Sequence, residues 1–226
     1  MRLGVLFSGG KDSCYALYKA MEKEQVVCLI SVLSENKESY MFHTPNIHLV
    51  RLQAKAIGLP IIEVTTKGKK EKELLDLKDA IFKAKNTYKI EGIVSGAIAS
   101  VYQATRIQKI CNELGLWCFN PLWQKNQLEL LDEIVRLKFK VIVSGIFAYP
   151  FTEEWLGRMI DKNSVKELEM LYRSHKINPC GEGGEFETTV LDAPFFEKEV
   201  LIKDYSLCYT RYSGTLSINN AVLVKK

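Results

Sequence analysis

A short stretch of small and charged residues near the N-terminus has the composition of a phosphate-binding loop. It consists of Ser8, Gly9, Gly10, Lys11, Asp12 and Ser13 and follows an apolar run. The glycines let the backbone turn tightly and approach a ligand, and the N–H groups at the start of a following helix attract anions. The serines can donate hydroxyl hydrogen bonds to phosphate oxygens, and the lysine supplies a positive charge. Asp12 cannot hold phosphate directly, but it can hold an accompanying Mg²⁺.

The glycine spacing of this segment excludes the two commonest phosphate motifs. Neither Gly-x-x-x-x-Gly-Lys-Ser/Thr nor Gly-x-Gly-x-x-Gly fits residues 8–13. The segment instead matches Ser-Gly-Gly-x-Asp-Ser, and here the chain resembles the PP-loop ATP pyrophosphatases. That resemblance implies cleavage of ATP between its α- and β-phosphates and adenylation of a carbonyl or carboxyl oxygen. The simpler alternative is a Gly-Gly turn followed by a helix cap.

A second group of chemistry-bearing residues lies in the glycine-rich stretch Cys180–Thr189. It contains three carboxylates within six residues, those of Glu182, Glu185 and Glu187. Gly183 and Gly184 lie between the first two. Carboxylates at this density can bind Mg²⁺, hold ammonium or act as a general base. An acidic surface turn is the simpler alternative. A nucleophilic role for Cys180 is weaker, because no histidine lies near it in the sequence.

The elements that must position these loops follow from the apolar periodicity. The first half predicts strands over Leu3–Ser8, Val26–Leu33, Ile61–Thr65, Glu91–Ile98 and Leu116–Phe119, and helices over Ser13–Lys23, Asn46–Ile57, Glu71–Tyr88 and Gln103–Leu114. Such alternation favours a parallel sheet with right-handed crossovers. The second half predicts helices over Gln127–Leu137 and Val165–His175, and strands over Lys140–Phe147, Thr188–Leu191, Glu199–Ile202 and Ala221–Val224.

The fold class that these elements predict is α/β, in two parts. An N-terminal parallel-sheet PP-loop domain is expected over residues 1–122, and a smaller α+β domain that binds substrate over residues 123–226. We place the boundary near Pro121–Lys125, where the regular alternation ends.

Composition sets limits on partners and location. The 226 residues carry a net charge of +4, too little to indicate direct nucleic-acid binding by itself. No apolar run is long enough to cross a membrane, and the N-terminus lacks a signal-peptide pattern, so a cytoplasmic location is expected. The six cysteines form no Cys-x-x-Cys pair, and the three histidines show no metal-ligand spacing.

Beyond the PP-loop superfamily, the chain resembles the diphthine–ammonia ligases almost from end to end. The resemblance rests on residues 8–13, 34–36, 39–43, 96–98, 102–106, 114–116, 121–123, 154–158 and 181–188, followed by Leu-Asp-Ala-Pro at 191–194. It implies that ATP, diphthine on elongation factor 2 and ammonium give diphthamide, AMP and pyrophosphate through an acyl-adenylate. ATP and Mg²⁺ are the implied cofactors. A homodimer is left open.

The resemblance and the predicted sheet together nominate further site residues. The ATP site should include the phosphate loop, Gly96 and Arg106, and the substrate site should include Tyr40, His43, Tyr102, Trp155, Gly183, Gly184 and Thr188. The implied quaternary ammonium of diphthine favours aromatic walls, for which Tyr40, Tyr102, Trp123 and Trp155 are candidates. Ordinary packing or surface roles remain the alternative for each of these residues.

The chemistry is expected to divide between the two loops. The N-terminal loop should bind ATP, with Lys11 and Asp12 acting on phosphate and metal from an exposed position. The acidic loop should serve the diphthine carboxylate and ammonia from the other side of a cleft. Glu185 is the preferred general base, with Glu182 and Glu187 as alternates. Another PP-loop enzyme that modifies tRNA, or a nucleotide-binding module without chemistry, remains an alternative function.

Overall fold

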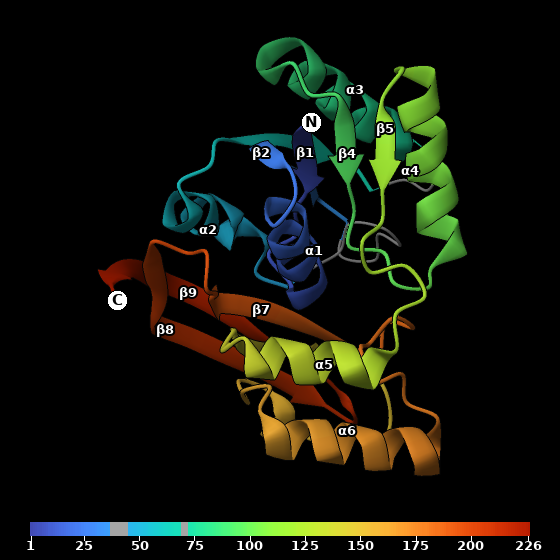
Figure 1. Ribbon diagram of the computed structural model, residues 1–226. Helices are drawn as coiled ribbons and strands as arrows, with labels where there is room; N and C mark the ends of the chain where they lie inside the picture. Colours follow the sequence, from blue (N-terminus) through green and yellow to red (C-terminus); the bar gives the residue numbers. More distant parts are fainter. Residues whose placement is uncertain (37–44, 69–71) are drawn as a thin grey trace.

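The computed structural model describes residues 1–36, 45–68 and 72–226, which form two sheets flanked by helices (Figure 1). The strands of the first sheet are parallel and lie in the order β3-β2-β1-β4-β5. They are β1 (Arg2–Leu6), β2 (Gln25–Ser34), β3 (Ile61–Thr66), β4 (Gly92–Val94) and β5 (Trp117–Phe119). The parallel sheet predicted for the N-terminal half is therefore confirmed.

Among the described residues, four α-helices cover the two faces of this sheet. They are α1 (Lys11–Met21), α2 (Val50–Ile57, preceded by the 3₁₀ turn η1, Ile47–Leu49), α3 (Glu73–Tyr88) and α4 (Val101–Glu113). Buried side chains of α1 and α2 pack in one apolar cluster, and those of α3 and α4 pack in another. Right-handed crossovers to either side of β1 place the helices on opposite faces in this way.

Strand β4 is shorter than the sequence predicts. The expected strand spans Glu91–Ile98, but pairing stops at Val94. The Ser95 hydroxyl donates to Asn120 Oδ1 at 2.5 Å and accepts the Ala97 N–H at 3.4 Å, so the chain turns into a loop. Because Ala97 and Ile98 are buried in this loop, their apolar character looks like a continued strand in the sequence.

The second half folds into an antiparallel sheet of order β7-β6-β9-β8, with helices α5 and α6 beside it (Figure 1). Its elements are α5 (Gln127–Arg136), β6 (Lys140–Ile146), the 3₁₀ turn η2 (Glu153–Trp155), α6 (Lys162–His175), β7 (Phe186–Asp192), β8 (Lys198–Thr210) and β9 (Ser213–Lys225). The predicted α+β architecture of this half is confirmed.

The β8–β9 hairpin is much longer than the two short strands predicted there. Both strands have 13 residues, whereas the sequence predicts only Glu199–Ile202 and Ala221–Val224. Burial does not favour a strand over the outer part of β8, which is exposed on both faces, although β9 buries Gly214, Leu216 and Ile218 at alternate positions. The turn of the hairpin gives no signal either, because Arg211 and Tyr212 adopt positive φ without the usual Asn-Gly.

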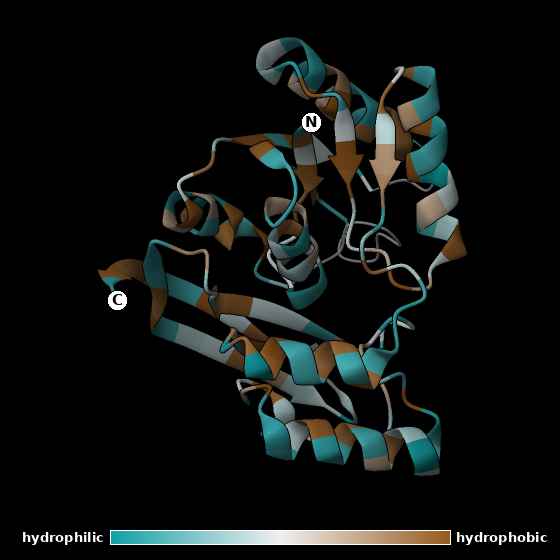
Figure 2. Ribbon diagram, viewed as in Figure 1, coloured by the Kyte–Doolittle hydropathy of each residue, from teal (hydrophilic) through white to brown (hydrophobic). Residues whose placement is uncertain are grey.

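The two sheets share one apolar core. Figure 1 shows α1 and α2 between them, and the apolar cluster of these helices continues into β6, β7, β9 and α5. Figure 2 shows hydrophobic residues concentrated on the central strands and on the inner sides of the helices. Leu122, at the predicted boundary, is fully buried in this cluster. A division between residues 122 and 123 therefore stays a prediction. None of the helices in the described ranges combines the length and apolarity of a membrane span.

A buried glutamine ties the first sheet unit to the second. Gln53 of α2 is 1% exposed, and its Nε2 donates to Gly9 O at 3.0 Å and to Val190 O at 2.8 Å. Gly9 belongs to the loop after β1, and Val190 lies in β7. One amide thus satisfies carbonyls from both halves of the chain.

Replacing this amide should destabilise the protein. We expect Gln53→Leu to lower the free energy of unfolding by about 1–3 kcal/mol, because two buried carbonyls lose a donor. Gln53→Glu should cost more at neutral pH, since a carboxylate would face both oxygens without donating. Urea unfolding measures both variants. Gln108→Leu is the control, because Gln108 is exposed and bonds only within α4, to Asn112. Equal stability of the Gln53→Leu and Gln108→Leu variants would contradict the bridging role.

Candidate active site

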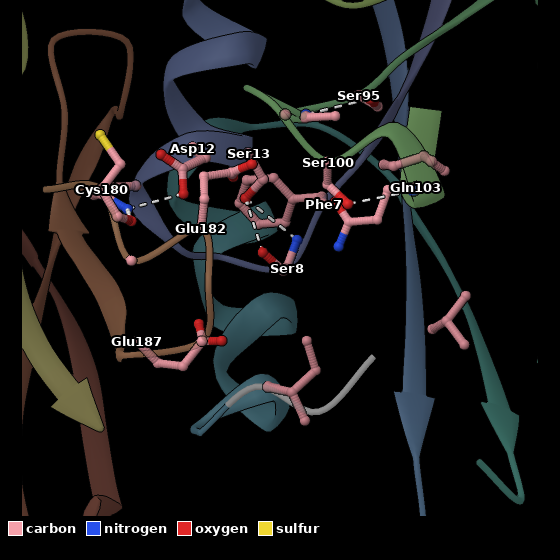
Figure 3. A pocket seen from close by; sticks show the side chains of 18 of the residues that line it. Phe7, Ser8, Asp12, Ser13, Ser95, Ser100, Gln103, Cys180, Glu182 and Glu187 are labelled. Atoms are coloured by element: carbon pink, nitrogen blue, oxygen red, sulfur yellow. Dashed lines mark hydrogen bonds and ion pairs between the residues drawn. The ribbon is translucent and has the colours of Figure 1, made fainter. Parts of the chain in front are cut away.

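A cavity of about 610 Å³ opens at the carboxyl ends of β1, β2 and β4. Here the strand order changes direction on either side of β1, and open α/β sheets bind ligands at such switch points. Figure 3 shows side chains from the phosphate loop, the loop after β4 and the acidic loop around the cavity. The sequence-predicted phosphate loop and acidic loop are thus brought together, although about 170 residues separate them in the chain.

The phosphate loop turns its carbonyl groups into the protein. Gly9, at φ +77°, has a carbonyl oxygen that accepts from Val190 N at 3.0 Å and from Gln53 Nε2. The Gly10 carbonyl accepts from Ser13 Oγ at 3.0 Å and from the Cys14 N–H at 3.1 Å. Carbonyls that accept hydrogen bonds do not repel an anion, and the N-cap residue Gly10 makes no side-chain cap, although the first N–H of α1, that of Lys11, donates to Thr188 Oγ1. The loop therefore presents the positive end of a helix to the cavity.

Gly96 allows the loop after β4 to pack against this helix start. A Cβ at Gly96 would lie 2.9 Å from both the Asp12 carbonyl carbon and the Ser13 nitrogen. No larger residue fits at that distance from backbone, so Gly96 is required for the close approach. The residue lines the cavity, and its contact with the nucleotide stays a prediction.

Lys11 connects the phosphate loop to the acidic loop. Its Nζ donates to Asp12 Oδ2 at 2.9 Å and to the Cys180 carbonyl, and its backbone N–H donates to Thr188 Oγ1 at 3.1 Å. Burial disfavours the charged ammonium, but nearby Asp12 outweighs this effect and raises the pKa of Lys11. The expectation that Lys11 projects from an exposed position is wrong, because the residue is only 2% exposed.

Asp12 lines the cavity and has a buried acceptor that is not used. Within the described part of the chain, its buried Oδ1 has no hydrogen-bond partner, while Oδ2 is bound to Lys11. Burial raises the pKa of Asp12, against the opposing effect of Lys11. A buried, unpartnered carboxylate oxygen suits a divalent cation, and Mg²⁺ commonly takes one or two carboxylates together with substrate phosphates. The predicted metal-binding role of Asp12 is compatible with this arrangement.

The three glutamates of the acidic loop differ in position. Glu182 and Glu187 line the cavity, and Glu182 Oε2 accepts the Ala99 N–H at 3.0 Å. Glu185 instead braces its own loop, because its carboxylate accepts the Asn178 N–H at 3.0 Å and the Gly183 N–H at 2.9 Å. The carboxylate of Glu185 is not part of the cavity wall, so the preference for Glu185 as the base is corrected.

Glu187 combines access to the cavity with a strongly shifted acidity. Burial raises its pKa to about 7, and the charges of Asp12 and Glu182 add to that rise while Lys11 opposes it. Burial also raises the pKa of Glu182, with Asp12 as a further cause. Glu187 can therefore exchange a proton near neutral pH, which is the property of a general base.

Several other predicted residues lie away from the cavity wall. Arg106 stacks on the Tyr102 ring at 3.4 Å, and neither side chain is among those that line the cavity. Trp155 is 7% exposed and packs edge-on against Phe151. Its side chain therefore lies in the core, which does not support the predicted contact with substrate. Trp123 is partly exposed and also lies outside the lining.

The remaining predicted residues divide into three groups. Gly183 and Gly184 line the cavity, and Thr188 contacts the phosphate loop as described above. Tyr40 and His43 fall outside the described residues. Burial raises the pKa of Cys180 to about 12, which argues against a nucleophilic thiolate at this position.

Three residues of the site were missed by the sequence analysis. Ser31 in β2 lines the cavity with a buried hydroxyl that has no partner in the described ranges. Phe147, after β6, lines the cavity with its ring. Gln53 positions the phosphate loop from α2. A polar residue within an apolar strand could have pointed to Ser31, whereas the other two depend on contacts across the two sheets.

A phosphate loop at the switch point of this parallel sheet, facing carboxylates, defines a nucleotide-binding α/β protein of the PP-loop class. Comparison with family models identifies the family to which the chain belongs. The diphthamide synthase N-terminal domain matches residues 1–118, and the diphthamide synthase C-terminal domain matches residues 126–224. The chain belongs to the diphthamide synthase family.

Curated relatives agree with this assignment. The diphthine–ammonia ligases of Bos taurus and Rattus norvegicus are 34% and 33% identical over 222 residues, which is 89% of this chain and 83% of each relative. A solved structure described as a predicted subunit of tRNA methyltransferase from Methanocaldococcus jannaschii DSM is 17% identical. It matches over 86% of this chain and 98% of that one, with a TM-score of 0.44, a likeness too weak to bear on function.

The raised pKa of Glu187 has a consequence for stability. Between the ordinary carboxyl value of 4.5 and about 7, the native state binds more protons at Glu187 than the unfolded chain does, so stability falls as pH rises through this window. Glu187→Gln should therefore stabilise the protein at pH 8, on the order of 1–3 kcal/mol, and much less at pH 4. Urea unfolding at the two pH values measures the difference. An equal effect at both values would show that Glu187 is not held in a charge-disfavouring site.

Proposed function

We propose that this protein is an ATP-dependent, AMP-forming amide ligase that converts diphthine on elongation factor 2 to diphthamide with ammonium. The observation that supports the proposal most is the direct contact between the two loops through Lys11, Thr188 and Cys180. This contact places an anion site and two cavity-lining carboxylates around one space of nucleotide size. Both family models and the named relatives fit the same reaction.

The phosphate loop serves the first half of the reaction. A carboxylate does not react with ammonia directly, because it would have to expel an oxide. Attack of the diphthine carboxylate on the α-phosphorus forms an acyl-adenylate and releases pyrophosphate. The start of α1, together with Ser8, Ser13 and Lys11, is arranged to stabilise the charge that develops on the phosphates.

The buried carboxylate of Asp12 serves the nucleotide through a metal. Its Oδ1 is a buried oxygen without a hydrogen-bond partner in the described residues and would hold Mg²⁺, and Lys11 keeps the other oxygen in place. A bound Mg²⁺ supplies charge neutralisation for the phosphates.

Glu187 serves the second half of the reaction. Ammonium must lose a proton before it can attack the acyl carbon, and a carboxyl with a pKa of about 7 can take that proton at neutral pH. Ammonia then displaces AMP to form the amide. The negative charges of Glu182 and Glu187 attract ammonium to the same wall of the cavity. A homodimer and a cytoplasmic location remain predictions from the sequence.

The products of ATP cleavage test the reaction type. With diphthine-bearing elongation factor 2 and ammonium present, ATP should give AMP and pyrophosphate in equal amounts, and little product should form without the factor. Chromatography of the nucleotides measures this. Formation of ADP and phosphate would contradict the proposal.

Asp12 can be tested with a nearly isosteric change. Asp12→Asn should lower the rate of AMP formation roughly 10²–10³-fold, because one preorganised charge is lost from the phosphate–metal site. Asp132→Asn is the matched control, since Asp132 is exposed on α5. Circular dichroism checks that both variants fold. If both variants turn over at the same rate, Asp12 has no part in the chemistry.

The identity of the general base can be tested by comparing variants of two glutamates in the same loop. Glu187→Gln should slow amide formation at least 10²-fold, and the ratio of wild-type to variant rate should rise with pH and level off above about 7. The ionisation of ammonium affects both enzymes equally, so its effect cancels in the ratio of the two rates at each pH. Glu185→Gln should retain the wild-type pH profile. The assignment fails if Glu185→Gln, and not Glu187→Gln, removes the inflection.

A further inference from the structure

Phe147 presents an aromatic ring to the cavity at a place that the reaction described above does not use. It follows β6 directly and is 39% exposed, although it lines the cavity. The other two aromatic residues of the described cavity wall, Phe7 and Phe186, are each 2% exposed. Lys11 Nζ already lies 5.3 Å from the centre of the Phe186 ring. Of these rings, Phe147 is the one available to a ligand.

The backbone register places the Phe147 ring on the face of the sheet that also carries Glu187. Gly145 in β6 pairs directly with Glu187 in β7, so any side chain at Gly145 would lie on the same face as Glu187. The Phe147 ring fills that space, because a Cβ at Gly145 would lie 2.8 Å from Phe147 Cζ. Because Gly145 has no side chain, the Phe147 ring fits on the face of the sheet that also carries Glu187.

The ring is held in this position from two sides. The Phe147 N–H donates to the Glu185 carbonyl at 2.8 Å, which fixes the backbone against the acidic loop. Pro45 also approaches the space over Gly145, with its Cγ 3.1 Å from the same Cβ position. A backbone fixed in this way limits the reordering that ligand binding requires at Phe147.

The charges of the cavity wall favour a cation. Its charged residues in the described part of the chain are three carboxylates and one ammonium, and Asp12 already pairs with that ammonium. Among the described residues, no cationic side chain forms an ion pair with Glu182 or Glu187. A hydrated metal ion would use the carboxylates alone, whereas a large, weakly hydrated onium ion also gains from an aromatic face.

We propose that the Phe147 ring and the Glu187 carboxylate form a subsite for a quaternary ammonium group. This inference rests on the proposed function, in which the subsite receives the quaternary ammonium of diphthine and so directs the neighbouring carboxyl group to the reaction centre. A cation here also favours the ionised form of Glu187, the form that accepts a proton from ammonium. The subsite replaces Tyr102 and Trp155, whose rings lie away from the cavity wall.

Tetramethylammonium is the probe that tests the subsite without the reaction. Its binding to the full chain, followed by NMR, should be saturable, and uncharged tert-butanol should bind much more weakly. Phe147→Leu should weaken tetramethylammonium binding about 2- to 30-fold, whereas Phe147→Trp should retain it. Phe82→Leu is the matched control, because Phe82 is 52% exposed on α3 and lies outside the cavity wall.

Two results would overturn the subsite. One is equal tetramethylammonium affinity in the wild type and Phe147→Leu, and the other is equal affinity for tetramethylammonium and tert-butanol. Thermal unfolding of each variant confirms that it is folded. The binding assay contains neither ATP nor elongation factor, so its outcome does not depend on the reaction type. In turnover assays, Phe147→Leu should raise KM for the modified factor by a similar factor and leave KM for ATP unchanged.

Discussion

The backbone of the phosphate loop is hydrogen-bonded to strand β7 of the second sheet, and the site is built around this contact. The Val190 N–H reaches the Gly9 carbonyl, the Lys11 N–H reaches Thr188 Oγ1, and Gln53 bonds carbonyls on both sides. Such contacts satisfy loop groups that would otherwise be buried without partners. They also leave Gly10 close to the Thr188 carbonyl, with only 3.2 Å to a Cβ at that position. The loop that binds phosphate is thereby part of both halves of the molecule.

This contact explains the electrostatics of the cavity. Strand β7 follows the acidic loop directly, and it is held against the start of α1. Glu182 and Glu187 therefore line the same cavity as Lys11 and Asp12. Burial and mutual repulsion then raise the pKa values of the carboxyl groups, which makes Glu187 a proton acceptor near pH 7. The proposed Mg²⁺ at Asp12 and the proposed cationic substrates would offset the repulsion between the acidic loop and the phosphates.

The sequence predicted the parallel sheet, both loops and the family, because each rests on local patterns. The Ser-Gly-Gly-x-Asp-Ser segment and the alternation of strands and helices are visible in short windows. The roles of individual glutamates were not predictable in the same way. Glu185 and Glu187 are two residues apart, and only the hydrogen bonds of Glu185 to Asn178 and Gly183 show that its carboxylate braces the loop. Phe147 and Gln53 likewise gain their significance from partners in a distant part of the chain. The β8–β9 hairpin was underestimated because the outer part of β8 is exposed on both faces and the turn lacks the usual Asn-Gly.

The central claim is that the phosphate loop and the acidic loop form one nucleotide site through β7. Amide hydrogen exchange measures this most directly, with and without an ATP analogue that cannot be cleaved between its α- and β-phosphates. The account predicts that the analogue slows exchange together in residues 9–14 and in residues 181–190, including the Val190 N–H. Slowed exchange confined to the first sheet unit, with residues 181–190 unchanged at saturation, would contradict it.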